Sequence, residues 1–201
     1  MFGVEAGVAL SQALSSHVGL VEAYLSYLIL EDEGAIALAN AFKECTPSLE
    51  VLEMAGNDIT AEAAPALASC IASKHLLKKL NLSDNKLKDE GAIRIGNALV
   101  GLKQLKEVDM STNQIRSAGA RVLALSVIEK PEFQLLNLNE NFISDEGIDE
   151  VTEMFARSPG ILGPFDENDP EGEDGDDKDE EEDDENELGL QLGNLEVNQE
   201  D

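Results

Sequence analysis

Carboxylates are the side chains of this 201-residue sequence that could most readily do chemistry: Asp and Glu number 42, against 14 Lys and Arg. Two carboxylates held close together can share the work of a general acid and a general base. In so acidic a chain no pair stands out as catalytic, but an Asp-Glu pair recurs at 32–33, 89–90 and 145–146. Each pair stands just before a segment with helical periodicity, where a carboxylate takes up free backbone N–H groups. We therefore predict helix N-caps at Asp32, Asp89 and Asp145, and at Ser117 in the equivalent position.

The other reactive residue types form no recognisable catalytic or metal-binding group. His17 and His75 occupy different positions of the repeat described below, and Cys45 and Cys70 form no CxxC pair. We expect the two cysteines to be buried or half-buried thiols in a reducing compartment. Arg116 follows a predicted strand, where an arginine finger toward a GTPase is conceivable, but a solvated side chain is the simpler interpretation. We predict no catalytic residue, no metal ligand and no cofactor.

Four asparagines spaced 28 residues apart define a repeat. The phrases that contain them are LEVLEMAGNDI (49–59), LKKLNLSDNKL (77–87), LKEVDMSTNQI (105–115) and FQLLNLNENFI (133–143). All four follow LxxLxLxxNxI, the leucine-rich-repeat signature. A side-chain amide at this position can pair with backbone groups of the neighbouring turn. We predict that Asn57, Asn85, Asn113 and Asn141 form a structural ladder rather than a catalytic site.

Each phrase predicts a short strand followed by a helix. Alternation of apolar and polar residues predicts the strand, and its inward pairs are Leu52/Met54, Leu80/Leu82, Val108/Met110 and Leu136/Leu138. Apolar residues at three- and four-residue spacing predict helices at 35–42, 92–99, 120–128 and 148–155. The expected fold class is α/β: a leucine-rich-repeat solenoid of about five 28-residue repeats of the ribonuclease-inhibitor type, with parallel strands inside and helices outside.

The predicted concave face is the natural place to bind a macromolecule, because a stack of repeats presents an extended surface there. One position of the strand reads Tyr24, Glu53, Asn81, Asp109 and Asn137 across the stack. A position in the following loop reads Tyr27, Gly56, Asp84, Thr112 and Glu140. These rows are polar and acidic, so they either meet a basic partner or are simply the solvated face of a repeat protein. The candidate partner-binding residues are Tyr24, Tyr27, Glu53, Asp84, Asp109 and Glu140.

The distribution of charge divides the chain at residue 165. Residues 1–165 hold nearly all of the apolar residues and are assigned to the solenoid, whereas 166–201 hold 19 acidic residues and one lysine, Lys178. We predict that 166–201 is a disordered acidic tail, because it cannot bury enough apolar surface and its charges repel. Leu188, Leu192 and Leu195 near its end belong either to a solvated tail or to a short docking motif. The acidity favours basic protein surfaces as partners and disfavours direct nucleic-acid binding.

Both ends of the array depart from the repeat. In LVEAYLSYLIL (20–30) an apolar residue, Leu28 or Ile29, replaces the asparagine, so we expect this turn to be less firmly held. Residues 4–14 read as a helix, which places the start of the chain inside a repeat and leaves a strand near 23–26 at an open sheet edge. We therefore expect the chain to be the C-terminal portion of a longer array. At the other end, Ile161 is expected to begin a strand that Pro164 stops.

Several segments together resemble a known family. The 28-residue repeats, KDEGAIRIGNAL, DMSTNQIRSAGAR, and FISDEGIDEV followed by LGPFDENDPEGED and an acidic tail are similar to the C-terminal half of plant-type Ran GTPase-activating proteins. The resemblance implies a crescent that binds Ran in its GTP form and stimulates GTP hydrolysis, with an asparagine and an arginine of earlier repeats most important. It also implies an amino-terminal targeting domain with a Trp-Pro-Pro motif, which we expect to be absent because the sequence has no tryptophan.

The function that we expect is Ran binding or scaffolding with weak or no activating power, because no position here matches the family's critical asparagine or arginine. The chain would then be a GTPase-activating regulator rather than an enzyme with its own substrate chemistry. The alternative is an acidic leucine-rich-repeat protein that binds histones or another basic protein. No apolar run reaches about 18 residues, so we expect no membrane insertion. The expected location is the cytoplasm, with the nuclear envelope and the nucleus as alternatives.

Overall fold

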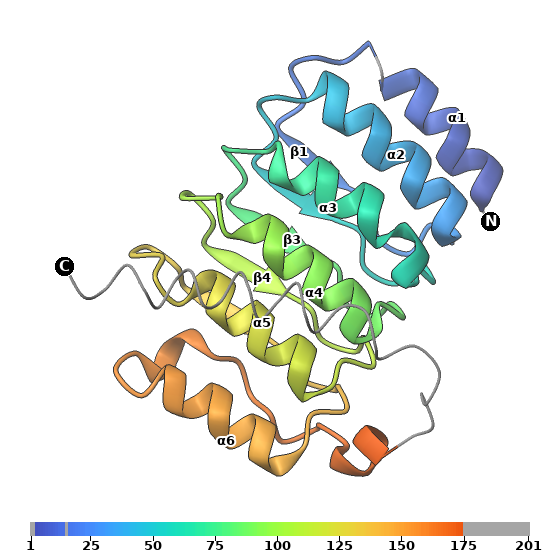
Figure 1. Cartoon of the computed structure of the whole chain (residues 1–201). Coiled ribbons are helices and arrows are strands. Elements are labelled where there is room, and N and C mark those ends of the chain that lie inside the picture. The colour runs from blue at the N-terminus through green and yellow to red at the C-terminus, as the bar shows by residue number, and fades with distance from the viewer. Residues whose placement is uncertain (1–2, 15, 175–201) are drawn as a thin grey trace.

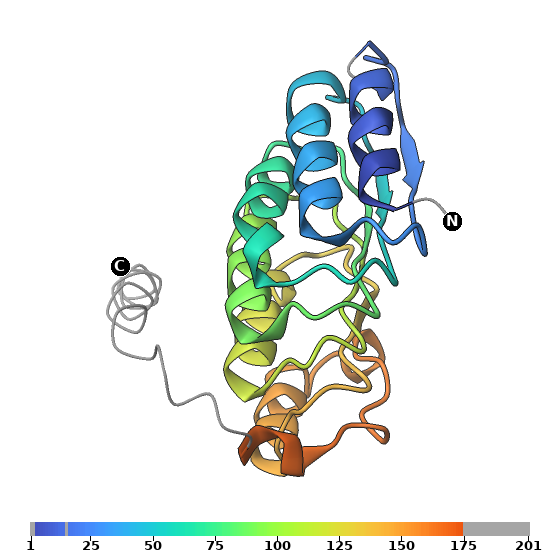
Figure 2. The same ribbon diagram turned by 90° about the vertical axis from the view of Figure 1, so that its right-hand side faces the viewer.

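The computed structural model describes residues 3–14 and 16–174. Its elements in chain order are α1 Val4–Leu14, β1 Glu22–Tyr24, α2 Glu31–Cys45, β2 Val51–Glu53, η1 Ala61–Ala63, α3 Ala64–Ala72, β3 Lys79–Asn81, α4 Lys88–Leu99, β4 Glu107–Asp109, α5 Ser117–Val127, β5 Leu135–Asn137, α6 Asp145–Met154, η2 Pro159–Ile161 and η3 Pro170–Asp174. The five strands form one parallel sheet in the order β1-β2-β3-β4-β5. The helices stack side by side along it (Figure 1), and Figure 2 shows them on one side of the molecule with the strands on the other. The predicted α/β leucine-rich-repeat solenoid is confirmed.

The strand register fixes how the first repeat aligns with the others. From β2 onward, paired residues are 28 apart, as in Leu52↔Leu80, whereas Ala23 of β1 pairs with Leu52, 29 residues on. Counting from these pairs, Leu28, rather than Ile29, stands at the ladder position of Asn57. Its backbone N–H donates to Asn57 Oδ1 at 2.9 Å. The first turn is thus bound by the following repeat and lacks a side-chain amide of its own.

The core runs unbroken through all the repeats. The predicted inward residues of β2 to β5 are at most 1% exposed, and they pack against helix residues such as Leu38, Leu67 and Ile95. Removing a side chain of this kind leaves a cavity, so a Leu→Ala substitution costs about 2–5 kcal/mol. Since each repeat covers its neighbour's apolar flank, the stability of one repeat depends on those beside it.

Lys74 is a buried charge that sequence reasoning missed. The residue is 1% exposed, and its Nζ donates to the carbonyl oxygens of Phe42 at 2.7 Å and Lys43 at 3.2 Å. These carbonyls belong to the last turn of α2, where a cation is favoured by the helix dipole. Burial lowers the pKa of Lys74. The lysine therefore ties the C-terminus of one helix to the loop of the next repeat.

The predicted N-caps are wrong, and the correction is informative. The caps are Leu30, Leu87, Arg116 and Ser144, and the predicted residues lie one or two positions inside the helices. Asp89 Oδ1 instead accepts the backbone N–H of Arg116 at 2.7 Å and of Gly119 at 3.1 Å. Asp32 likewise accepts the N–H and the hydroxyl of Thr60. These carboxylates cap the next repeat rather than their own helix.

The last repeat continues beyond the predicted boundary at residue 165. The expected strand at Ile161 is reduced to a single parallel bridge between Leu162 and Leu136. Further on, Asn168 Oδ1 accepts the backbone N–H of Asn141 at 3.0 Å, and Glu167 exchanges hydrogen bonds with Asn139. Residues 166–174, which sequence reasoning assigned to the tail, thus contact the last repeat. The predictions for 175–201, including those for Leu188, Leu192 and Leu195, lie outside the described residues.

None of the helices in the described part of the chain combines the length and the apolar composition needed to cross a lipid bilayer.

Cys70 gives a testable pH dependence. Burial in α3 raises the pKa of its thiol to about 11 from an ordinary value of 9.0. Because the folded state holds this proton more tightly, its contribution is fully present below pH 9 and is lost as the pH rises toward 11. We expect the free energy of unfolding to fall over this window by about 2–3 kcal/mol more than in Cys70→Ala, measured by urea denaturation. A constant difference between the two proteins from pH 8 to 11 would show that the thiol does not titrate as described.

Candidate partner-binding surface

The face of the sheet that the helices leave uncovered, here called the strand face, carries the predicted row of side chains in register. Tyr24 pairs with Glu53, Glu53 with Asn81, Asn81 with Asp109, and Asp109 with Asn137. Neighbouring strands lie about 4.8 Å apart, so these residues form one continuous row. The second row lies in the loops that follow the strands, at Tyr27, Gly56, Asp84, Thr112 and Glu140.

All five residues of the loop row have left-handed backbone conformations, with φ between 53° and 63°. Only glycine adopts this conformation without strain, and other residues pay about 1–2 kcal/mol. The repeat therefore imposes the turn on tyrosine, threonine and glutamate alike. Their side chains consequently project from equivalent points of five successive turns.

Tyr24 and Tyr27 are the large aromatic groups of this surface. They are 60% and 69% exposed, and the Tyr24 hydroxyl donates to Glu22 Oε2 at 3.2 Å. This hydrogen bond raises the pKa of Tyr24. The Tyr27 ring lies over the backbone of Gly56, where an added Cβ would collide with it. The Tyr27 ring therefore packs against the backbone of Gly56 while remaining exposed to solvent. Tyrosine is a residue type enriched at binding hot spots.

Two of the four predicted acidic contacts are already engaged within the chain. Glu53 Oε1 lies 2.9 Å from Lys79 Nζ, and a hydrogen bond to Glu53 raises the pKa of Lys79. Asp109 Oδ1 accepts the N–H and the hydroxyl of Ser111, at 3.0 and 2.7 Å, and the Asn137 amide at 3.2 Å. Because both carboxylates are already paired with groups of the strand face, they are less available to a basic partner.

Asp84 and Glu140 are the acids that remain exposed in the loop row. Glu140 Oε2 accepts the Thr112 hydroxyl at 3.3 Å, and the backbone N–H of Asp84 donates to Ser111 at 2.9 Å. Their turns are fixed while their carboxylates face solvent. Of the six predicted partner-binding residues, Tyr24, Tyr27, Asp84 and Glu140 therefore stand available on one face.

The asparagines link this face to the stack behind it. Asn85 Oδ1 accepts the backbone N–H of Asn57 at 3.1 Å and of Ile59 at 3.0 Å, and its Nδ2 lies within 3.1 Å of three carbonyl oxygens. Asn57 and Asn141 make the same pattern, and Asn113 a similar one. Asn168 extends the series at the C-terminal end. Sequence reasoning missed it because no LxxLxL phrase precedes it, although it stands 27 residues after Asn141.

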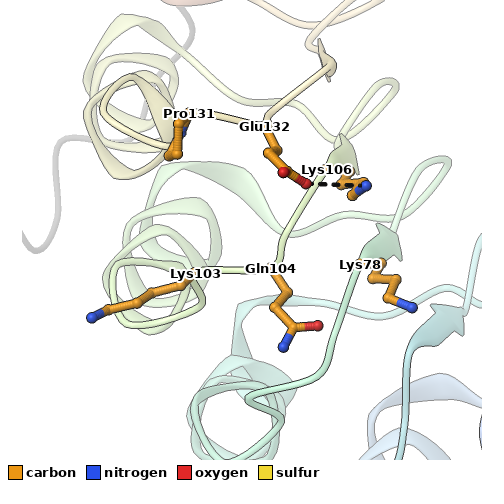
Figure 3. A pocket seen from close by; sticks show the side chains of 6 residues that line it. All are labelled: Lys78, Lys103, Gln104, Lys106, Pro131 and Glu132. Carbon is orange, nitrogen blue, oxygen red and sulfur yellow. Dashed lines mark ion pairs between the residues drawn. The ribbon is translucent and has the colours of Figure 1, made fainter.

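The two edges of the sheet differ in charge: the strand-to-helix side is strongly acidic, whereas on the helix-to-strand side lysines are mixed with the glutamates Glu44, Glu50, Glu129 and Glu132. The strand-to-helix loops and first helical turns, here the acidic edge, include Asp58, Asp84, Asp89, Glu90, Glu140, Asp145 and Glu146. The helix-to-strand side, here the lysine edge, includes Lys43, Lys74, Lys78, Lys103, Lys106 and Lys130. A hollow of about 340 Å³ lies on the lysine edge, lined by Lys78, Lys103, Gln104, Lys106, Pro131 and Glu132 (Figure 3). In the part of the chain that the structure describes, no three His, Cys, Asp or Glu residues are grouped to hold a metal ion.

Comparison with known proteins places the repeats in a family. A leucine-rich-repeat family model matches residues 47–68, 73–96 and 103–124. The chain is 65% identical, over 177 residues, to RAN GTPase-activating protein 1 of Arabidopsis thaliana, and 59% identical, over 184 residues, to RAN GTPase-activating protein 2 of the same plant. These alignments cover 87% and 88% of this chain. Along most of its length the chain therefore matches a leucine-rich-repeat part of these Ran GTPase-activating proteins.

The chain spans only about a third of the length of these two Ran GTPase-activating proteins, 33% and 34%. The aligned part includes most of the described repeats, so the family likeness extends to the strand face and both edges. Activity and partners of the whole Ran GTPase-activating proteins are therefore a separate question from the fold that this chain shares with them.

Proposed function

We propose that this chain binds the small GTPase Ran through the strand face and the adjoining acidic edge. The observation that carries the proposal is the identity of about 60% to two Ran GTPase-activating proteins along most of the chain. Tyr24 and Tyr27 supply exposed aromatic area, and Asp84 and Glu140 supply negative charge on the same face. This combination suits a partner with basic residues around an apolar contact.

In this proposal the chain is a regulator without substrate chemistry of its own, and it has weak or no activating power by itself. Stimulating GTP hydrolysis requires groups placed against the γ-phosphate or the attacking water. Arg116 is the arginine nearest to a strand-to-helix loop, but its backbone is anchored to Asp89 as the N-cap of α5. In this proposal the chain binds Ran, and the groups that stimulate GTP hydrolysis do not belong to this chain.

The direct test is binding of the full chain to Ran loaded with a non-hydrolysable GTP analogue or with GDP, measured by biolayer interferometry. We expect measurable binding that favours the GTP-analogue form. Equal binding of both forms, or none at micromolar concentration, would contradict the proposal.

The two loop acids provide a variant test. We expect Asp84→Lys combined with Glu140→Lys to weaken binding about tenfold, mainly by slowing association, because charges at the rim of an interface steer encounter. The matched control is Glu44→Lys combined with Glu129→Lys, which makes the same change in net charge at exposed positions near helix C-termini. An equal loss in both variants would mean that only overall charge matters.

The acidic edge also supports a second candidate, binding of histones or another basic protein. Long-range attraction of this kind is non-specific and falls steeply with salt. We expect histone binding to be lost by about 0.3 M NaCl, where the Debye length is about 6 Å, while the aromatic contact with Ran persists. Histone binding that survives this salt, without Ran binding, would favour the second candidate.

Location follows from the partner. We place the chain in the cytoplasm, with the nuclear envelope or the nucleus as alternatives, and a fluorescent fusion observed in plant cells distinguishes them.

A further inference from the structure

The lysine edge contains a surface that the function above does not use. Lys78, Lys103 and Lys106, here called the lysine surface, line a hollow formed by three successive helix-to-strand loops. In Figure 3 Glu132 reaches Lys106, and the Lys103 side chain extends to the opposite side from Lys78 and Lys106. Three of the six lining residues are lysines and one is a glutamate. Glu50, which pairs with Lys78, adds a second glutamate, so the three lysines leave a local excess of one positive charge on a chain whose net charge is −28. Such a surface fits an acidic ligand.

The lysines are held by weak, exchangeable pairs. Lys78 Nζ lies 2.6 Å from Glu50, with side-chain exposures of 41% and 33%, and Lys106 lies 3.3 Å from Glu132, with exposures of 36% and 73%. Exposed pairs of this kind contribute about 0–1 kcal/mol each. Lys103 is exposed at the mouth of the hollow. A ligand with many carboxylates can therefore replace these partners at little cost.

The net charge of the chain decides which acidic ligand is best placed. A separate acidic protein is repelled at long range by a molecule of this charge. A segment of the same chain meets the same repulsion, but its tether gives it a high effective concentration that offsets it. Residues 176–187 hold ten acidic residues and one lysine. We propose that the lysine surface binds the chain's own acidic run 176–187.

The length of chain permits this contact. The segment leaves the solenoid on the acidic edge, where the N–H of Asp169 donates to Asn141 at 2.8 Å. The lysine surface lies at the other end of the helices, and a helix of 11 residues is about 16 Å long. Two or three strand spacings add about 10–15 Å. From Asp174 to Glu187 an extended chain reaches about 43 Å, so the second half of the acidic run can meet the lysines.

The contact has a consequence for partners. Carboxylates held on the lysine edge are not free to attract a basic protein, and a basic partner must compete with Lys78, Lys103 and Lys106 for them. The contact is electrostatic and exposed, so it weakens as salt shortens the Debye length to about 4 Å near 0.5 M.

The test is zero-length carbodiimide cross-linking of the full chain at low protein concentration, with the products identified by mass spectrometry. Residues 179–187 are expected to cross-link to the lysine surface at least about fivefold more often than to Lys86 and Lys88 on the opposite edge, and to lose this preference near 0.5 M NaCl. The side chain of Lys86 is 55% exposed, against 41% for Lys78. Exposure alone would therefore favour cross-links to Lys86, which is the opposite of the expected result. Equal yields at both edges would overturn the proposal. Mixing isotope-labelled and unlabelled chains separates intramolecular links from links between copies, and a majority of mixed links would also overturn it.

A second measurement uses substitutions at the surface. In Lys78→Gln/Lys103→Gln/Lys106→Gln we expect a glutamate-specific protease to cleave the acidic run about threefold faster than in the unchanged protein. Lys86→Gln/Lys88→Gln/Arg94→Gln is the control with the same change in net charge away from the lysine edge, and its cleavage rate should match that of the unchanged protein. Equal acceleration in both variants would contradict the proposed contact.

Discussion

Substituting Asn85 by alanine is expected to lower the free energy of unfolding by about 3–5 kcal/mol. The residue is 6% exposed, and truncation leaves the N–H groups of Asn57 and Ile59 without their acceptor. Each buried donor left unpaired costs about 1–3 kcal/mol. Three carbonyl oxygens, of Met54, Leu82 and Ser83, lose a donor as well. Urea denaturation followed by circular dichroism gives the value.

The matched control is Asn97→Ala in α4, which belongs to the same repeat but is exposed. Alanine is the better helix former there, so we expect a change within about 0.5 kcal/mol, in either direction. If Asn85→Ala is no more destabilising than this control, the ladder contributes little and the strand pairs alone hold the turns. We also expect a broader unfolding transition for Asn85→Ala, because a repeat array with one weakened unit loses cooperativity.

Substituting Gly119 by alanine is expected to cost about 2–3 kcal/mol even though alanine favours helices. A Cβ at Gly119 would lie 2.5 Å from Asp89 Oδ1, 2.9 Å from Ile115 and 3.0 Å from Ala92. The first contact displaces the carboxylate that accepts the N–H groups of Arg116 and Gly119, so α5 loses its cap. The contact with Ala92 pushes α5 away from α4, and the contact with Ile115 crowds the segment that leads into α5. The effect therefore combines overpacking with an unsatisfied helix terminus.

Gly101→Ala is the control for this change, because nothing lies within 4 Å of a Cβ built there. It should be neutral or stabilise the fold by up to about 1 kcal/mol, because alanine reduces the conformational entropy of the unfolded chain. Thermal denaturation of both variants separates the two mechanisms, since backbone entropy alone would stabilise both. A stabilising Gly119→Ala would mean that the neighbouring helices yield without cost.

The periodic part of the structure was predictable because individual residue types at regular positions indicate its strands and repeats. Leu80 and Leu82 alternate with polar residues and are buried, and the spacing of the four asparagines fixed both the repeat length and the parallel strands. The same periodicity placed Glu53, Asn81 and Asp109 in one row, which the strand register bears out. In each case the information lies within a few consecutive residues or in an equal spacing.

The features that were not predictable depend on contacts between repeats. Asp89 stands where a helix cap is usual, yet its carboxylate serves the next helix, and only the lateral packing of α4 on α5 reveals this. Lys74 reads as a surface residue until the end of α2 is placed against it. Glu53 and Asp109 read as free acids, because their partners Lys79 and Asn137 come from neighbouring strands.

A single-turnover measurement of GTP hydrolysis by Ran, with this chain in excess, tests most directly the claim that these repeats hold the GTPase without activating it. The account predicts that Ran is bound under these conditions and that its hydrolysis rate stays within about twofold of the intrinsic rate. Activating proteins raise such rates by about 10³-fold or more. An acceleration of that order by this chain alone would contradict the account, because the groups that act on the γ-phosphate would then have to belong to this chain.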